Sequence, residues 1–350
     1  MRFRILALVA CASLAVVAFA TSGMATSPNK TVVVYDDFSS GDNSKWTAIY
    51  GPGELANPDA DHQMTFPNGT QRVRAVPFRT GADFSVFDHL KYIEVSNSSF
   101  AVPAKGSVEF SVDITAQTPG TVTPLTQQGI YGPPGTWTDP ANPPSPPNYS
   151  ANVLEGQQAG VVLNMIDFCT GQLFDWFVTS NTAFTLIERL PTNVTGNTSN
   201  PGCPGASFVG PSKMYTQIVN EVNIGGGPHK VSIRYSAKQN SVQYILDGEV
   251  VSKVNNVGIP LDKQGVPYTG IYPSLGPGES LAGTLTSFTI GHGLFSLIDA
   301  FPYQHPEVPE LSVSIPVGTY DPADAGRARL FAQGADGTWD NFIVTTSTKE

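Results

Sequence analysis

The sequence has little charge, no basic run and few cysteines. Only 14% of its 350 residues are charged, and 19 basic residues stand against 29 acidic ones, for a formal net charge of −10. Binding to phosphate backbones requires a clustered positive face, which this composition does not offer. After the N-terminal 25 residues, no apolar stretch reaches the roughly 20 residues of a membrane span. We therefore expect no nucleic-acid partner and no membrane span.

Helical periodicity is also nearly absent, and its one candidate is residues 293–300, long enough for about two turns. Short strand-forming runs separated by Gly, Pro, Asn and Asp take its place. This pattern is typical of a β-sandwich or barrel, so we predict an all-β fold with one short helix. The clearest runs are 31–35, 71–76, 107–114, 160–167, 172–179 and 182–190.

An N-terminal targeting segment stands apart from the rest of the chain. Arg2 and Arg4 precede an apolar run over residues 5–20 that ends in small residues, which is the pattern of a secretory signal peptide. We predict that residues 1–25 are removed and that the mature protein is secreted and extracellular. Six Asn-x-Ser/Thr sequons agree with a glycoprotein, and they begin at Asn29, Asn68, Asn97, Asn148, Asn193 and Asn197.

Two cysteines, Cys169 and Cys203, remain once Cys11 leaves with the signal segment. In an oxidising compartment, two cysteines most simply form one disulfide bond. A metal site is the alternative, but neither cysteine has a nearby histidine or second cysteine at ligand spacing. The sequence therefore predicts a disulfide between Cys169 and Cys203.

Residues 132–150 are rich in proline and could be either a linker between domains or a long loop within one domain. We prefer a loop within a single domain over residues 30–350. Long ordered loops tend to be functional, and Trp137 in this loop could offer a stacking surface to a ligand. A surface excursion with scattered aromatic residues is the alternative.

The strongest local pattern is a hairpin formed by residues 229–235 and 241–248. Val231, Ile233 and Tyr235 alternate with polar residues in the first strand. Such alternation indicates strands with one buried face.

Three segments carry a resemblance to a known family: residues 35–41 (YDDFSSG) followed by Trp46, residues 246–249 (LDGE) at the end of the hairpin, and residues 337–344 (GTWDNFIV). Together they resemble the concanavalin A-like lectins and glucanases, a LamG-like jelly-roll superfamily. The resemblance implies two antiparallel sheets with the first and last strands side by side. It supports the fold more than any activity.

Residues 164–168, 173–177 and 188–191 look like an uncharacterised family of secreted jelly-roll proteins, which carries no activity over. The wider superfamily implies a structural Ca²⁺ ion near the paired terminal strands. Asp36, Asp37 and Asp340 are the oxygen donors available there. Acidic residues that cap turns are the alternative, and no other cofactor is expected.

The laminarinase-like members of this superfamily carry Glu-x-Asp-x-x-Glu on one strand, and this sequence lacks that motif. A different carboxylate pair follows from the meander over residues 160–190. If Asp167 pairs with Gln172 and Thr179 with Thr182, alternate residues form one core face and one half-apolar face. The second face would carry Asn164, Phe177, Asp175 and Glu188, the last two as diagonal neighbours.

Two carboxylates in a half-apolar groove are the arrangement that glycoside hydrolysis needs, because burial raises the pKa of the acid. We assign Glu188 as the acid and Asp175 as nucleophile or base, with Asn164 and Phe177 binding substrate. Two alternatives remain open. The carboxylates could be structural, paired with Arg189, Arg234 or backbone amides, or they could bind sugar hydroxyls without cleavage.

Residues 291–306 form a second candidate, because several polar side chains lie between Gly and Pro and suggest a pocket rim. His305 could act as base in a polysaccharide lyase, with Tyr303 as acid. Gln304 and His292 would then help bind substrate. Surface histidines without a role are the alternative.

The sequence as a whole predicts a secreted monomer that recognises a cell-wall or extracellular polysaccharide. A glycoside hydrolase or a polysaccharide lyase is the first alternative, and a structural or adhesive wall protein is the second. The sugar and its linkage cannot be read from these residues.

Overall fold

The computed structural model describes residues 29–48, 62–78, 90–122, 126–128, 150–152, 154–190, 209, 212–272, 276–297 and 333–350. Most strands belong to two sheets. The first sheet contains β1 (Lys30–Asp36), β3 (Gln63–Thr65), β4 (Gln71–Ala75), β6 (Ser107–Gln117), β13 (His229–Ser236), β14 (Ser241–Leu246), β15 (Glu249–Asn255) and β18 (Ala335–Ser347).

The second sheet contains β2 (Trp46–Ala48), β5 (Leu90–Ala101), β9 (Gly160–Asp167), β10 (Gln172–Val178), β11 (Thr182–Arg189), β12 (Tyr215–Asn223), β16 (Thr269–Tyr272) and β17 (Ser287–Phe295). The remaining elements are short. They are the pair β7 (Thr126–Gln128) and β8 (Ser150–Asn152), the helices α1 (Glu155–Gln158) and α3 (Leu261–Gln264), and a 3₁₀ turn (Pro67–Gly69).

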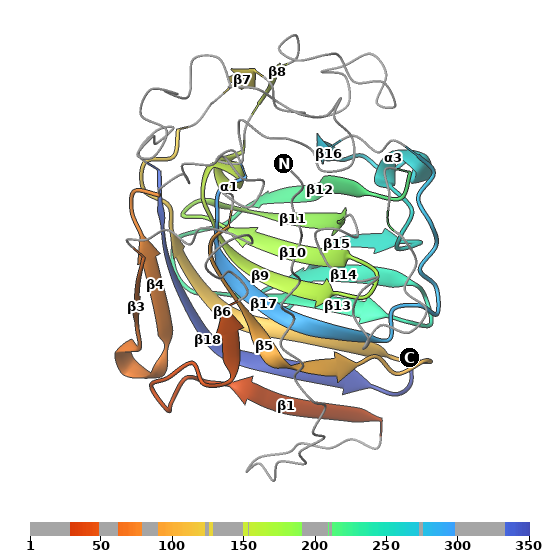
Figure 1. Cartoon of the computed structure of the whole chain (residues 1–350), viewed down its shortest axis with the longest axis horizontal. Helices are drawn as coiled ribbons and strands as arrows, with labels where there is room; N and C mark the ends of the chain where they lie inside the picture. The colour runs from red at the N-terminus through yellow and green to blue at the C-terminus, as the bar shows by residue number, and fades with distance from the viewer. Residues whose placement is uncertain are drawn as a thin grey trace, which may run out of the picture.

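Two antiparallel sheets of eight strands pack face to face (Figure 1). The first has the order β15-β14-β13-β6-β18-β4-β3, with β1 also paired to β18, and the second has the order β16-β12-β11-β10-β9-β17-β5-β2. Strand β10 contacts β6 and β13, while β9 contacts β6 and β18. The predicted all-β class and two-sheet jelly-roll sandwich are confirmed.

The first and last strands lie side by side, as the resemblance implied. Strand β1 pairs antiparallel with β18, with Val33 opposite Val344 (Figure 1). Because β18 also pairs with β6 and β4, it is an interior strand of the first sheet. The predicted hairpin 229–248 is confirmed by β13 and β14, and Val231, Ile233 and Tyr235 are fully buried.

One hydrophobic core fills the space between the sheets, and two tryptophans cross it. The indole of Trp176 in β10 donates to the carbonyl oxygen of Ser232 in β13 at 2.9 Å. In the opposite direction, Trp339 in β18 donates to the carbonyl oxygen of Val162 in β9 at 3.2 Å. Both indoles are fully buried, so each satisfies its polar atom without leaving the core.

The helix predicted at residues 293–300 is wrong over its described part. Residues 293–295 are the end of β17, whose residues Ile290, His292 and Leu294 alternate toward the core. The period of two, with glycines between the large residues, favours an extended strand over a helix. No helix in the described part of the chain is long and apolar enough to cross a membrane.

Replacing Trp176 with alanine is expected to lower the free energy of unfolding by about 3–5 kcal/mol, because a buried indole and its hydrogen bond across the sandwich are both lost. Urea denaturation followed by far-UV circular dichroism measures the change. The matched control is Val250→Ala, at a side chain that is 51% exposed, where the change should stay within about 0.5 kcal/mol. Equal effects at the two positions would contradict the core that we describe.

Candidate functional site

The meander of β9, β10 and β11 has the predicted register. Gln172 lies opposite Asp167, and the amide of Thr179 donates to the carbonyl oxygen of Thr182 at 2.9 Å. Asn164 in β9 therefore lies directly opposite Asp175 in β10. Glu188 in β11 lies two residues beyond Leu186, the direct partner of Asp175, which makes the two carboxylates diagonal neighbours on one face.

This face is the outer face of the second sheet, turned away from the first sheet, and apolar side chains border the polar ones on both sides. A phenylalanine cluster lies on one side of them and a small aliphatic cluster on the other. The phenylalanine cluster comprises Ile93, Val162, Phe177, Phe184, Leu186, Ile218 and Phe295. The small aliphatic cluster comprises Val95, Ile166 and Leu173. Asn164, Asp175 and Glu188 thus form a polar stripe between two apolar patches.

Asp175 is 1% exposed and has a single hydrogen-bond donor. The side-chain amide of Asn164 donates to its Oδ1 at 2.5 Å. Among the described residues, its Oδ2 has no hydrogen-bond partner, nor does Oδ1 of Asn164, and both atoms are buried. Burial first, and the neighbouring Glu188 second, raise the pKa of Asp175 well above its usual range.

Glu188 is the more exposed member of the pair. Its Oε2 accepts a hydrogen bond from the hydroxyl of Thr216 at 3.1 Å. Burial raises the pKa of Glu188 to about 7, against the effect of this hydrogen bond. Near neutral pH the pair therefore holds a proton.

Neither of the arginines considered from the sequence neutralises the pair. The guanidinium of Arg189 donates to the carbonyl oxygen of Thr170 at 3.0 Å and to Glu279 at 3.1 Å. Arg234 donates to Glu109 at 2.6 Å. The expectation that Arg189 or Arg234 pairs with these carboxylates is wrong, because each arginine is committed to another acid.

Two buried tyrosines lie near the carboxylates and stay neutral. Burial raises the pKa of Tyr244 and of Tyr215 far above neutrality, and the charge of Glu188 adds to both shifts. Tyr244 donates to the carbonyl oxygen of Leu186 at 2.6 Å. Each phenol is therefore neutral and does not compensate the negative charge of an ionised carboxylate pair.

Phe177 is a buried member of the phenylalanine cluster. Its ring stacks on Phe184 with centroids 4.6 Å apart, and only 2% of the residue is exposed. A side chain at Gly156 of α1 would collide with Phe184, and one at Gly160 would collide with Phe177. These glycines allow the backbone at α1 to lie close against the two rings.

Thr216 is the site residue that sequence reasoning missed. It lies in β12 directly opposite Glu188 and is 5% exposed. A prediction of the pairing between β11 and β12 would have found it. Residues 190–214 separate the two strands, so no short turn fixed their register in advance.

His292 does not lie with the polar stripe, because it points between the sheets. It is fully buried, and its Nε2 donates to Oε1 of Gln71 at 2.5 Å. The rings of Trp46 and Trp339 lie with centroids 4.4 and 5.0 Å from the imidazole. Burial lowers the pKa of His292 to about 3, so it is neutral at physiological pH. The structure thus gives His292 a core position instead of a rim position.

Of the three aspartates considered for calcium, Asp37 and Asp340 lie near each other, because the charge of Asp37 contributes to the raised pKa of Asp340. Asp36 is 2% exposed. Its Oδ1 accepts from Lys45 at 3.2 Å, and its Oδ2 accepts from Trp46 at 2.8 Å. Asp37 accepts from the hydroxyl of Ser39 at 2.7 Å, while burial raises the pKa of Asp340. Within the described ranges, no three acidic, histidine or cysteine side chains form a group that could hold a metal ion. Calcium stays a prediction that the contacts of Asp36 do not support.

Several predicted residues lie outside the described residues. They are Trp137, Cys203, Tyr303, Gln304 and His305. Cys169 is described and lies in the turn between β9 and β10, so its predicted pairing with Cys203 stays a prediction. The proline-rich segment is described only at Ser150, where β8 begins.

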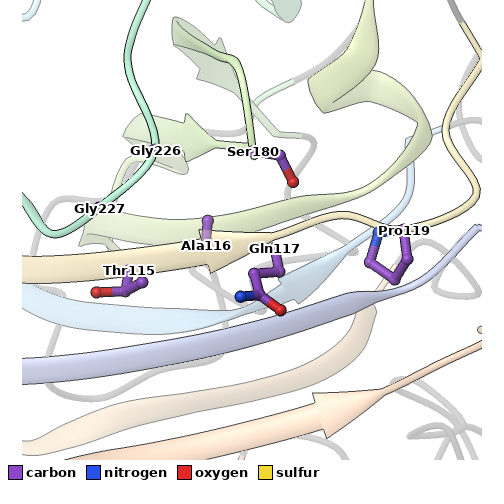
Figure 2. Close-up of a pocket in the computed structure, with 7 residues that line it drawn as sticks. All are labelled: Thr115, Ala116, Gln117, Pro119, Ser180, Gly226 and Gly227. Atoms are coloured by element: carbon purple, nitrogen blue, oxygen red, sulfur yellow. The ribbon is translucent and has the colours of Figure 1, made fainter.

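Two pockets lie elsewhere on the sandwich and carry no carboxylate of the pair. Figure 2 shows the first, of about 420 Å³, where Gln117 and Pro119 lie near Ser180 and the glycines at 226 and 227. None of its lining side chains titrates. The second, of about 370 Å³, lies on the outer face of the first sheet beside the Arg234–Glu109 ion pair.

Comparison with known proteins gives one family and several solved structures. The model of a family of unknown function, DUF6081, matches residues 149–348, more than half of the chain. No curated protein matches the sequence.

The solved structures are similar at low identity. An endo-1,3-β-glucanase from Streptomyces sioyaensis is 10% identical with a TM-score of 0.42, covering 93% of this chain and 100% of that one. The Crh5 transglycosylase in complex with NAG is 13% identical with a TM-score of 0.40, covering 94% of this chain and 86% of that one. At these values the similarities carry no argument about activity.

Replacing Asp175 with asparagine is expected to stabilise the fold at pH 8. A carboxyl whose folded-state pKa is raised above its ordinary value of 3.8 stabilises the fold fully only below that value, and the contribution is lost as pH rises. Each unit of pKa difference corresponds to about 1.4 kcal/mol, so the gain should exceed about 1 kcal/mol at pH 8 and shrink toward pH 4. Urea denaturation at both pH values measures it.

The matched control is Asp36→Asn, because Asp36 is equally buried but accepts hydrogen bonds from a lysine and an indole. That variant should lose stability. If Asp175→Asn loses as much as Asp36→Asn, Asp175 is a structural residue.

His292 generates a pH effect of opposite sign. Because its folded-state pKa of about 3 lies below its ordinary value of 6.5, its contribution to stability is present above pH 6.5 and is lost as the pH falls toward 3. The loss should approach about 1.4 kcal/mol per pH unit. Urea denaturation across this range, compared with His292→Gln, measures the difference. Parallel profiles for the two proteins would rule the contribution out.

Proposed function

The chain belongs to DUF6081, a family of unknown function, and from this starting point we propose that it is a carbohydrate-active jelly-roll protein that binds polysaccharide on the outer face of its second sheet. One observation carries the proposal. Two buried acceptor atoms near Glu188, Oδ1 of Asn164 and Oδ2 of Asp175, have no hydrogen-bond partner within the ranges that the structure describes.

Such an arrangement is expensive for the fold. A buried polar atom without a partner costs about 1–3 kcal/mol, and a buried carboxyl pair costs more unless a cation or several donors compensate it. In the described ranges, Asp175 receives one hydrogen bond, and no cation lowers its pKa. A fold does not need this arrangement for its own stability, so a ligand that supplies the missing donors is the best physical reason for it.

The surroundings favour a sugar as that ligand. The polar stripe runs between the phenylalanine cluster and the small aliphatic cluster. Sugar rings combine hydroxyl donors with apolar faces, and ligand sites commonly join apolar walls to a few placed polar groups. Glu188 is the partly exposed member of the stripe, so a glycan would approach the stripe from the side of Glu188.

We propose further that the protein is secreted and acts on cell-wall or extracellular polysaccharide as a monomer. The support is the N-terminal segment, in which Arg2 and Arg4 precede the apolar run 5–20. A mature chain with one Cys169–Cys203 disulfide belongs to the same proposal.

Hydrolysis of the bound sugar is the second candidate, and the raised pKa values of the pair favour it. Burial raises the pKa of both carboxyls, so the pair can hold a proton near neutral pH. A proton donor can then lie beside a carboxylate, as glycoside hydrolysis requires. The roles assigned from the sequence, Glu188 as acid and Asp175 as nucleophile or base, stay a prediction.

Incubating the mature protein with plant, algal, fungal and bacterial polysaccharides tests both candidates. Pelleted protein measures binding, and mass spectrometry of the supernatant detects released oligosaccharides. We expect wild type to pellet with at least one polysaccharide, and Asp175→Asn or Glu188→Gln to weaken binding at least about tenfold, because each substitution replaces a carboxylate acceptor of the polar stripe.

The matched control is Glu109→Gln, on the outer face of the first sheet and paired with Arg234, which should bind like wild type. Saturated products that both carboxylate variants abolish would make the protein a hydrolase, whereas unsaturated products that persist in them would move attention to His305. Failure to bind any polysaccharide would overturn the proposed function and favour a structural or adhesive protein.

A further inference from the structure

The polar stripe contains two buried acceptor atoms to which no donor is supplied. The amide of Asn164 donates to Asp175, and the hydroxyl of Thr216 donates to Glu188. In the described part of the chain, Oδ1 of Asn164 and Oδ2 of Asp175 have no hydrogen-bond partner. A ligand that fits this stripe must therefore bring donors.

The stripe also lacks a counter-charge. The outer-face residues of β9, β10 and β11 are apolar, neutral or acidic in the described part of the chain. The nearest arginine in sequence, Arg189, is held by Glu279 and the carbonyl of Thr170. A ligand with its own carboxylate or sulfate would meet repulsion here and no cation.

We propose that the polar stripe binds the ammonium group of an amino sugar, so that the preferred ligand is a glycan with free amines. The inference rests on the proposed carbohydrate function and names its ligand class. An ammonium carries three donors and no acceptor, which is the complement of Asn164 Oδ1, Asp175 Oδ2 and the carboxylate of Glu188.

The positive charge of the ligand would also offset the electrostatic repulsion between the carboxylates of Asp175 and Glu188. Desolvation raises the pKa of both carboxyls, and the charge of Glu188 raises the pKa of Asp175 further. A cation between them favours their charged forms. A neutral hydroxyl would fill one acceptor but leave this repulsion in place.

A divalent metal ion is a weaker fit to the same atoms. Calcium takes six to eight oxygen ligands, and this stripe offers two carboxylates and one amide oxygen. Within the described ranges, no three acidic, histidine or cysteine side chains gather as a metal site. An ammonium needs only the acceptors that are present.

Isothermal titration calorimetry of the mature protein at pH 6.5 tests the inference. The ligands are a β-1,4-linked glucosamine tetramer, its fully N-acetylated form, a neutral glucose tetramer of the same linkage, a galacturonic acid tetramer and a tetralysine peptide. We expect the glucosamine tetramer to bind at least about tenfold more tightly than each of the others. Asp175→Asn and Glu188→Gln should each remove at least about tenfold of that affinity, and Glu109→Gln should not.

Chelator-treated protein, titrated with calcium chloride, is run beside these samples. Equal affinity for the acetylated, neutral or acidic tetramers would overturn the ammonium assignment while leaving the carbohydrate function standing. Tighter binding of tetralysine would overturn the amino-sugar assignment, as would calcium binding that both carboxylate variants abolish. Unchanged affinity in both variants would place the ligand elsewhere. Failure of every glycan to bind would overturn the proposed function itself.

Discussion

The central strands of the second sheet are buried on both faces, and the chemistry of the molecule depends on this constraint. All residues of β9 and β10 are buried, although antiparallel sheets commonly leave one face to water. The inner face joins the core between the sheets. The outer face holds the polar stripe in surroundings where a charge is hard to solvate. The pKa values of Asp175 and Glu188 are therefore raised although both residues lie in ordinary β-strands.

Two aspartates show what burial alone does not decide. Asp36 and Asp175 are 2% and 1% exposed. Asp36 receives hydrogen bonds from Lys45, Trp46 and a backbone amide, so the buried carboxylate is satisfied within the fold. Asp175 receives one bond, from Asn164, and shares its surroundings with another acid. The number of donors, not the depth of burial, therefore separates these two carboxylates.

The buried histidine is a polar group of the same sandwich that does not belong to the candidate binding site. His292 lies against tryptophan rings and donates to Gln71, which in turn donates to Glu94 at 3.0 Å. This chain of contacts links β17 in the second sheet to β4 in the first. Because the imidazole is neutral and enclosed, it belongs to the packing of the two sheets.

The sequence alone determined the meander and its faces. Short turns after Asp167 and Thr179 fix the register of β9, β10 and β11, and a period of two then assigns Asn164, Asp175 and Glu188 to one face. The pairing of the first and last strands followed from a family resemblance. Local patterns suffice for the meander because adjacent strands connected by tight turns have few alternative pairings.

Only the tertiary structure decided what surrounds those residues. Thr216 reaches Glu188 through a strand that follows a long connection, and His292 faces inward because alternate residues of β17 point into the core. The arginines that could have neutralised the acids are held by Glu279 and Glu109, which are distant in sequence. Ion pairs and burial depend on which distant segments meet in space, and a sequence pattern with a period of two contains no such information.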